Sequence, residues 1–102
     1  MTEIGDLQKA ISIERVNRGF VTDPVKLQVL LTEEIGEMAS EIKKLWSKNY
    51  GQFEQRRLED EIADAFVLLA AMAEQFDIDI EQAVARKFFQ KDGLREWKSA
   101  IE

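Results

Sequence analysis

Two pairs of acidic residues have the spacing that a helical metal site requires. Glu34 and Glu37 form the first pair, and Glu61 and Asp64 form the second. Helix residues three positions apart lie on one face, with Cβ atoms about 5–6 Å apart. Each pair would therefore present two carboxylates that can share one cation or bridge two. A short connection between the two helices predicts antiparallel packing, which would let all four carboxylates converge.

The ordinary alternative is solvated surface charge, because glutamates at this spacing are common on exposed helix faces. Two features favour a metal site. The pairs lie on neighbouring helices, and Asp64 opens an apolar stretch, although aspartate is seldom fully buried without a partner. Converging carboxylates repel one another, and a divalent cation reverses that balance. Gly36 adds support, because a mid-helix glycine often admits a close neighbour.

The absence of two residue types narrows the chemistry. The chain has no cysteine and no histidine. This excludes disulfides, thiolate metal sites, a cysteine nucleophile and the usual general base. A metal must therefore be held by oxygen, which favours a hard cation such as Mg²⁺ or Mn²⁺. A di-iron helical bundle is excluded, because it needs Glu-x-x-His motifs.

Charge and hydropathy indicate the partners that the chain lacks. The net charge of −6 argues against binding to a phosphate backbone, so we expect no nucleic-acid partner. The acidic start at residues 1–6 is unlike a signal peptide. The longest apolar run, residues 65–73, is too short to span a bilayer. We therefore expect a cytoplasmic protein with no membrane partner.

The sequence predicts an all-α fold of four helices in a single domain, residues 1–102. The expected helices cover about residues 3–17, 24–47, 53–76 and 80 onward. Asp23 and Pro24 form a strong helix start, with an N-cap side chain and a proline at the first position. Asp79 is expected to cap the last helix in a capping-box pattern with Gln82. Asp92-Gly93 should break or kink that helix before a short tail at residues 94–101.

The third helix predicts association between copies of the chain. From Ile62 to Ala73 every residue except Asp64 is apolar. A helix that is apolar all round must be buried on all sides, and three other helices in a small chain can hardly provide that cover. We expect a second copy to provide it, giving a homo-oligomer. The alternative is one buried helix in a monomer.

The acidic motifs also resemble a known family. Glu34-x-x-Glu37 followed by Glu61-x-x-Asp64 is similar to the E-x-x-E…E-x-x-D motif of MazG-like, all-α nucleoside triphosphate pyrophosphohydrolases. The resemblance extends over residues 30–39, 61–69 and 76–87. The upstream residues Glu14-Arg15, Phe20 and 24–27 are similar to the lead-in of dCTP-pyrophosphatase-like members.

The resemblance implies an enzyme that cleaves a (deoxy)nucleoside triphosphate to the monophosphate and pyrophosphate, with a role in nucleotide-pool housecleaning. It implies Mg²⁺ dependence, with Mn²⁺ as a substitute, and a four-helix subunit that assembles into an intersubunit bundle as a homodimer or homotetramer. The implied metal ligands are Glu34, Glu37, Glu61 and Asp64. Glu33 is our candidate for the general base, and a solvent-facing neighbour of a ligand is an equal alternative.

The cations that would face substrate phosphates are harder to place. Lys87 matches a lysine of the family, whereas Lys91 stands where the family often has asparagine. These residues and Arg95 would share a face only if the last helix continued through Gly93. The alternative is a solvated basic face.

Three residues are candidates for a nucleobase pocket: Asn17, Phe20 and Trp46. For Trp46, packing between helices is the stronger alternative. A tryptophan that the family often carries after Glu14-Arg15 is missing here.

Two other functions remain open from the sequence. One is the related phosphoribosyl-ATP pyrophosphatase, which uses the same superfamily scaffold. The other is a non-catalytic helical dimerisation or regulatory module, in which the carboxylates are surface charge and the apolar helix is a dimer seam.

Overall fold

The computed structural model describes residues 3–96. Within this range every regular element is helical, which confirms the predicted all-α fold. The α-helices are α1 (Glu3–Asn17), α2 (Pro24–Ile42), α3 (Gln55–Gln75) and α4 (Ile80–Val84). Shorter segments are the 3₁₀ turns η1 (Lys43–Leu45) and η2 (Lys48–Tyr50) and the π-helical η3 (Ala85–Lys91).

Two predicted helix starts are confirmed. The Asp23 carboxylate accepts a hydrogen bond from the Lys26 backbone amide at 3.0 Å, and Pro24 is the first residue of α2. The Asp79 carboxylate accepts from the Gln82 amide at 3.0 Å and caps α4. Both bonds satisfy amides that have no partner inside the helix.

The end of the second helix differs from the expectation. α2 stops at Ile42 and tightens into η1, instead of continuing to about Ser47. Ser47 is extended and caps the next turn, because its hydroxyl accepts from the Asn49 amide at 3.2 Å. Gly51 then takes φ +100°, a conformation that favours glycine, and the chain reverses toward α3.

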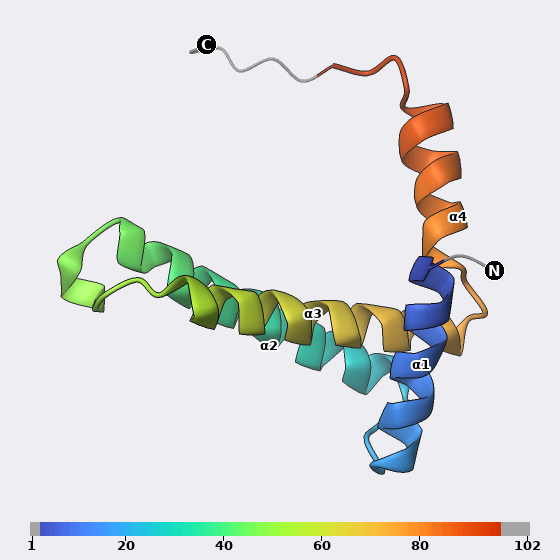
Figure 1. Cartoon of the computed structure of the whole chain (residues 1–102), viewed down its shortest axis with the longest axis horizontal. Helices are drawn as coiled ribbons and strands as arrows, with labels where there is room; N and C mark the ends of the chain where they lie inside the picture. The colour runs from blue at the N-terminus through green and yellow to red at the C-terminus, as the bar shows by residue number, and fades with distance from the viewer. Residues whose placement is uncertain (1–2, 97–102) are drawn as a thin grey trace.

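α2 and α3 form a long antiparallel hairpin, as expected (Figure 1). Its core contains Leu27, which is fully buried, with Leu68 and Ala71. The partly buried Leu30 and Met72 pack against this cluster. The core lies between the start of α2 and the second half of α3. It therefore fixes which faces of α2 and α3 meet in the rest of the hairpin.

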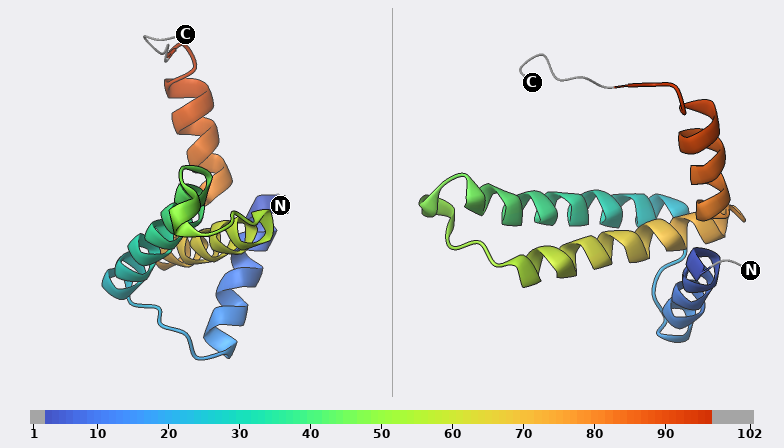
Figure 2. Two further views of the ribbon diagram at one scale, coloured as in Figure 1. Left: turned by 90° about the vertical axis from the view of Figure 1, so that its left-hand side faces the viewer. Right: turned by 45° about the horizontal axis from the view of Figure 1, so that its top comes forward.

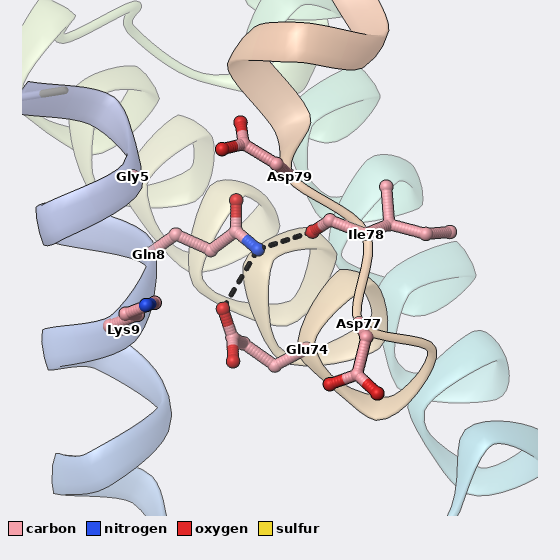
Figure 3. Close-up of a pocket in the computed structure, with 7 residues that line it drawn as sticks. All are labelled: Gly5, Gln8, Lys9, Glu74, Asp77, Ile78 and Asp79. Carbon is pink, nitrogen blue, oxygen red and sulfur yellow. Dashed lines mark hydrogen bonds between the residues drawn. The ribbon is translucent and has the colours of Figure 1, made fainter. Parts of the chain in front are cut away.

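α1 packs across α3 and is fastened by one buried polar residue, Gln8 (Figure 3). Its amide nitrogen donates to the Glu74 carboxylate at 2.9 Å and to the Ile78 carbonyl at 2.6 Å. Its amide oxygen accepts from the Ile80 backbone amide at 3.1 Å. Gln8 therefore ties α1 to the turn between α3 and α4.

α4 and η3 extend away from the hairpin on the side opposite to α1 (Figures 1 and 2). The helical segment ends at Lys91, which confirms the predicted break at Asp92-Gly93. A Cβ at Gly93 would lie 2.6 Å from the Phe89 carbonyl oxygen, so this turn requires glycine. Residues 97–101 of the expected tail lie outside the described residues.

The single chain does not bury α3 on all sides. Leu68, Ala70 and Ala71 are buried, whereas Ile62 and Leu69 are 50% and 45% exposed. Part of the apolar surface of α3 therefore stays exposed within one chain. Among the residues described, no helix is both long and apolar enough to cross a bilayer.

Candidate metal centre and adjoining cleft

Carboxylates from both helices of the hairpin meet near its middle. Glu34 comes from α2, and Glu61 and Asp64 come from α3. One oxygen from each lies within 4.8 Å of the others. Opposite ligands of an octahedral Mg²⁺ are about 4.2 Å apart, so small side-chain adjustments would let these oxygens share a cation.

Glu37 lies beside this group. The carboxyl groups of Glu37 and Glu61 are close enough to share a hydrogen bond. This hydrogen bond, burial and the nearby Glu34 together raise the pKa of Glu61 to about 7. Burial raises the pKa of Glu34 as well, and the charges of Glu37 and Asp64 act in the same direction. Repulsion within the acidic group therefore favours retention of protons when no cation is bound.

Two buried oxygens test whether this group fits a metal. Glu34 Oε2 and Glu61 Oε2 are both buried, and no described N–H or hydroxyl group donates a hydrogen bond to either. Buried carboxylate oxygens without donors are costly in free energy. A divalent cation would satisfy them, and the all-oxygen donor set suits Mg²⁺ or Mn²⁺. The residues present therefore fit a hard cation.

Asp64 differs in burial from what its apolar neighbours indicated. It is exposed, because the apolar residues around it on α3 are themselves partly uncovered in the single chain. Gly36 likewise has open space around it, since a Cβ there would meet nothing within 4 Å. The close neighbour that we expected at Gly36 is therefore not supplied by residues 3–96.

A cleft of about 530 Å³ opens directly beside the carboxylates. Its lining residues are Arg15, Arg18, Phe20, Val21, Leu30, Glu34, Asp64, Val67 and Leu68. One wall comes from the hairpin, and the other comes from the end of α1 and the segment after it. The volume lies within the usual range for small-molecule sites, about 300–1,000 Å³.

Phe20 is the one predicted nucleobase residue that lines this cleft. Asn17 is exposed at the end of α1 and does not line it. Trp46 is 83% exposed, follows η1 beyond the end of α2 and does not line the cleft. Glu33 is exposed on α2, about 100° around the helix from Glu34.

The three predicted phosphate-binding cations lie elsewhere in the chain. The Lys87 ammonium bonds to Asp92, and the Arg95 guanidinium lies 3.6 Å from the same carboxylate. Lys91 is the last residue of η3, so Arg95 does not continue its helical face. Lys87 instead borders an apolar groove between α3 and the α4–η3 segment. Within one chain these cations are not brought to the carboxylates.

Two arginines of the cleft, Arg15 and Arg18, were absent from our predicted site. Arg15 donates to the Val21 carbonyl at 2.9 Å, and its guanidinium lies 5.2 Å from the centre of the Phe20 ring. Arg18 is exposed and pairs with Glu14 at 2.8 Å. Their i,i+3 spacing at the end of α1 was the available signal, but nothing in the sequence placed α1 beside the carboxylates.

Comparison with known proteins identifies the family of the hairpin and of the α4–η3 segment. The family model of the MazG nucleotide pyrophosphohydrolase domain matches residues 23–95. The chain belongs to this family. The chain is also 31% identical over 74 residues to the uncharacterized protein YpjD of Bacillus subtilis (strain 168), covering 68% of this chain and 67% of YpjD. No solved structure gives a significant match.

The MazG match begins at Asp23 and contains all four carboxylates. α1 lies before it. The cleft therefore has one wall inside the matched MazG segment and one wall, with Arg15, Arg18 and Phe20, outside it.

Proposed function

We propose that the chain is a Mg²⁺-dependent pyrophosphohydrolase that cleaves a nucleoside or deoxynucleoside triphosphate to the monophosphate and pyrophosphate. The main support is the set of buried, donor-free oxygens of Glu34 and Glu61 beside a cleft, in a chain of the MazG family. Mn²⁺ is expected to substitute for Mg²⁺, because both prefer oxygen ligands. A role in clearing the nucleotide pool follows from this activity.

Each carboxylate has a proposed role at this centre. Glu34, Glu37, Glu61 and Asp64 would hold the hard cations. A divalent cation held there would neutralise phosphate oxygens and lower the pKa of an attacking water. Glu33 remains our candidate for the group that accepts the water's proton, because it adjoins the ligands on α2 and is open to solvent. Phe20 would stack against the base, since its ring borders the same cleft.

We also propose that the working form is a homodimer or homotetramer of this single domain. The chain exposes 8194 Å², whereas a compact monomer of 11.8 kDa exposes about 5,900 Å². Large apolar side chains on α3 and on the α4–η3 segment contribute to this surface, including Ile62, Leu69, Phe88 and Phe89. The groove between these elements, about 470 Å³, is lined mainly by apolar residues and would be covered by a second copy.

The direct test is product analysis with purified protein, Mg²⁺ and a panel of nucleotides. Release of pyrophosphate together with the monophosphate is expected, and release of orthophosphate is not. Glu37→Gln and Asp64→Asn should each lower the rate at least about 100-fold, because they remove a charge that holds the cations. Glu59→Gln, at an exposed site on α3, is the matched control and should keep full activity.

Three results would contradict this function. They are no pyrophosphate from any nucleotide, unchanged activity in both site variants, and activity confined to phosphoribosyl-ATP. The last would assign the chain to the related pyrophosphatase instead.

A further inference from the structure

The carboxylates beside the cleft, Glu34 and Asp64 among its lining residues, would repel a polyphosphate unless positive charge offsets them. The carboxylates would also offset the charge of any divalent cation bound among them, so the loaded centre would offer a polyphosphate less positive charge than the free cation. A polyphosphate also brings several negative charges of its own. Other positively charged groups are therefore needed beside it. Among the described residues lining the cleft, the cations are Arg15 and Arg18.

These two arginines differ in how firmly they are held. Arg15 is half-buried, donates to the Val21 carbonyl at 2.9 Å and lies over the Phe20 ring at 5.2 Å. These contacts fix the segment that follows α1. Arg15 is therefore suited to hold the cleft wall in place. It is less suited to give up its present contacts and bind a ligand.

Arg18 is open to solvent and loosely held. Its side chain is 62% exposed, and its Nε donates to Glu14 Oε1 at 2.8 Å. A guanidinium has five N–H groups in a planar fork, so this bond leaves donors that can reach an oxyanion. An exposed i,i+4 ion pair is worth little, so a phosphate can displace Glu14 at small cost.

We propose that Arg18 binds the polyphosphate part of the substrate at the rim of the carboxylate cleft, and that Arg15 positions this wall. The identity of the substrate rests on the proposed function, whereas binding of a polyphosphate by Arg18 does not depend on hydrolysis. A second recess of about 230 Å³ adjoins the same wall, bordered by Ile11, Phe20 and Val67. It leaves room on the apolar side of the arginines for the rest of a nucleotide.

Calorimetric titration with inorganic tripolyphosphate in the presence of Mg²⁺ tests this directly. The wild-type chain should bind, and Arg18→Gln should bind about 10- to 100-fold more weakly, the usual loss for a charge-assisted hydrogen bond. Arg18→Lys should be intermediate, because it keeps the charge and loses the fork. Glu14→Gln should bind at least as tightly as wild type, since it releases the guanidinium.

Arg56→Gln is the matched control. Arg56 is 84% exposed on α3 and lies about 140° around the helix from Glu61, so tripolyphosphate affinity should be unchanged. Binding of Mn²⁺ alone should be the same in wild type and Arg18→Gln, because Arg18 contacts no carboxylate of the centre in its described bonds. Circular dichroism would establish that each variant is folded.

Three outcomes would overturn the inference: no tripolyphosphate binding by wild type, equal binding by Arg18→Gln, or parallel loss of Mn²⁺ binding in that variant. Failure of the proposed function looks different. In that case tripolyphosphate binding would still depend on Arg18, but no nucleotide would yield pyrophosphate.

Discussion

At the scale of single residues, Glu61 links the stability of the metal-free protein to pH. Its pKa is raised from the ordinary 4.5 to about 7, first through the hydrogen bond with Glu37. Between these values the folded chain keeps a proton that the unfolded chain has released. The free energy of unfolding should therefore fall as pH rises from about 4.5 to 7 and then level off.

Thermal melts in a chelator at several pH values would measure this. Glu61→Gln is the control and should flatten the decline, because the glutamine cannot titrate. A wild-type melting temperature that rises over the same interval would contradict the prediction.

The carboxylates also predict how site variants respond to metal. Glu37→Gln and Asp64→Asn should fold, and without metal they should melt at or above the wild-type temperature, because each relieves repulsion among the acidic groups. Mg²⁺ should raise the melting temperature of wild type and have little effect on either variant. Differential scanning fluorimetry with and without Mg²⁺ would detect this. A wild-type protein indifferent to Mg²⁺ would count against the site.

Residues of the site differed in how well the sequence could predict them. The approach of Glu34 to Glu61 and Asp64 was predictable because helix periodicity is local, and a short connection between two amphipathic helices leaves few ways to pack them. Arg15 and Arg18 were not, because their place depends on how α1 lies across the hairpin. The buried polar contacts of α1 with the end of α3 and with the turn that follows it are made by Gln8, a polar residue with no periodic signal.

At the scale of elements, Gln8 should be a main determinant of how α1 is docked. It is 2% exposed, donates to the Ile78 carbonyl in the turn before α4 and accepts from the Ile80 amide at the start of α4. Gln8→Leu leaves the Ile78 carbonyl and the Ile80 amide without this partner, so we expect a loss of about 2–4 kcal/mol in the free energy of unfolding. Urea denaturation would measure it.

Gln75→Leu, at an exposed position near the end of α3, is the control and should change stability by about 0.5 kcal/mol or less. Equal stability of the two variants would show that the hydrogen bonds of Gln8 do not hold α1 in place.

The starts of α2 and α4 could be predicted more closely than the end of α2. Asp23 and Asp79 each begin a helix through a side-chain hydrogen bond within one turn, and such a local pattern can be recognised in the sequence. The end of α2 depends instead on a 3₁₀ turn and on Ser47, which caps the following segment. The π-helical turns of η3 had no sequence signal that we recognised, because a wider helix depends on local packing more than on residue type.

At the scale of the whole molecule, exposed apolar surface predicts self-association. Sedimentation should find a dimer or tetramer, with no stable monomer at micromolar concentration. Phe88 is 59% exposed and borders the apolar groove, so Phe88→Asp should shift the population toward monomer and lower the melting temperature. A wild-type monomer that melts cooperatively at high temperature would contradict this.

The cleft joins the family-matched hairpin to a helix that precedes the matched segment. Under the proposed function, the carboxylates that would hold the cation and part of the wall that would face the substrate lie in separate stretches of polypeptide. Exchange of residues 3–20 for those of another MazG-family chain should therefore change which ligand binds in the cleft, while the four carboxylates proposed to hold the cation stay unchanged. Conversely, a fragment trimmed to residues 23–95 would keep the four carboxylates and lose the cleft wall formed by Arg15, Arg18, Phe20 and Val21.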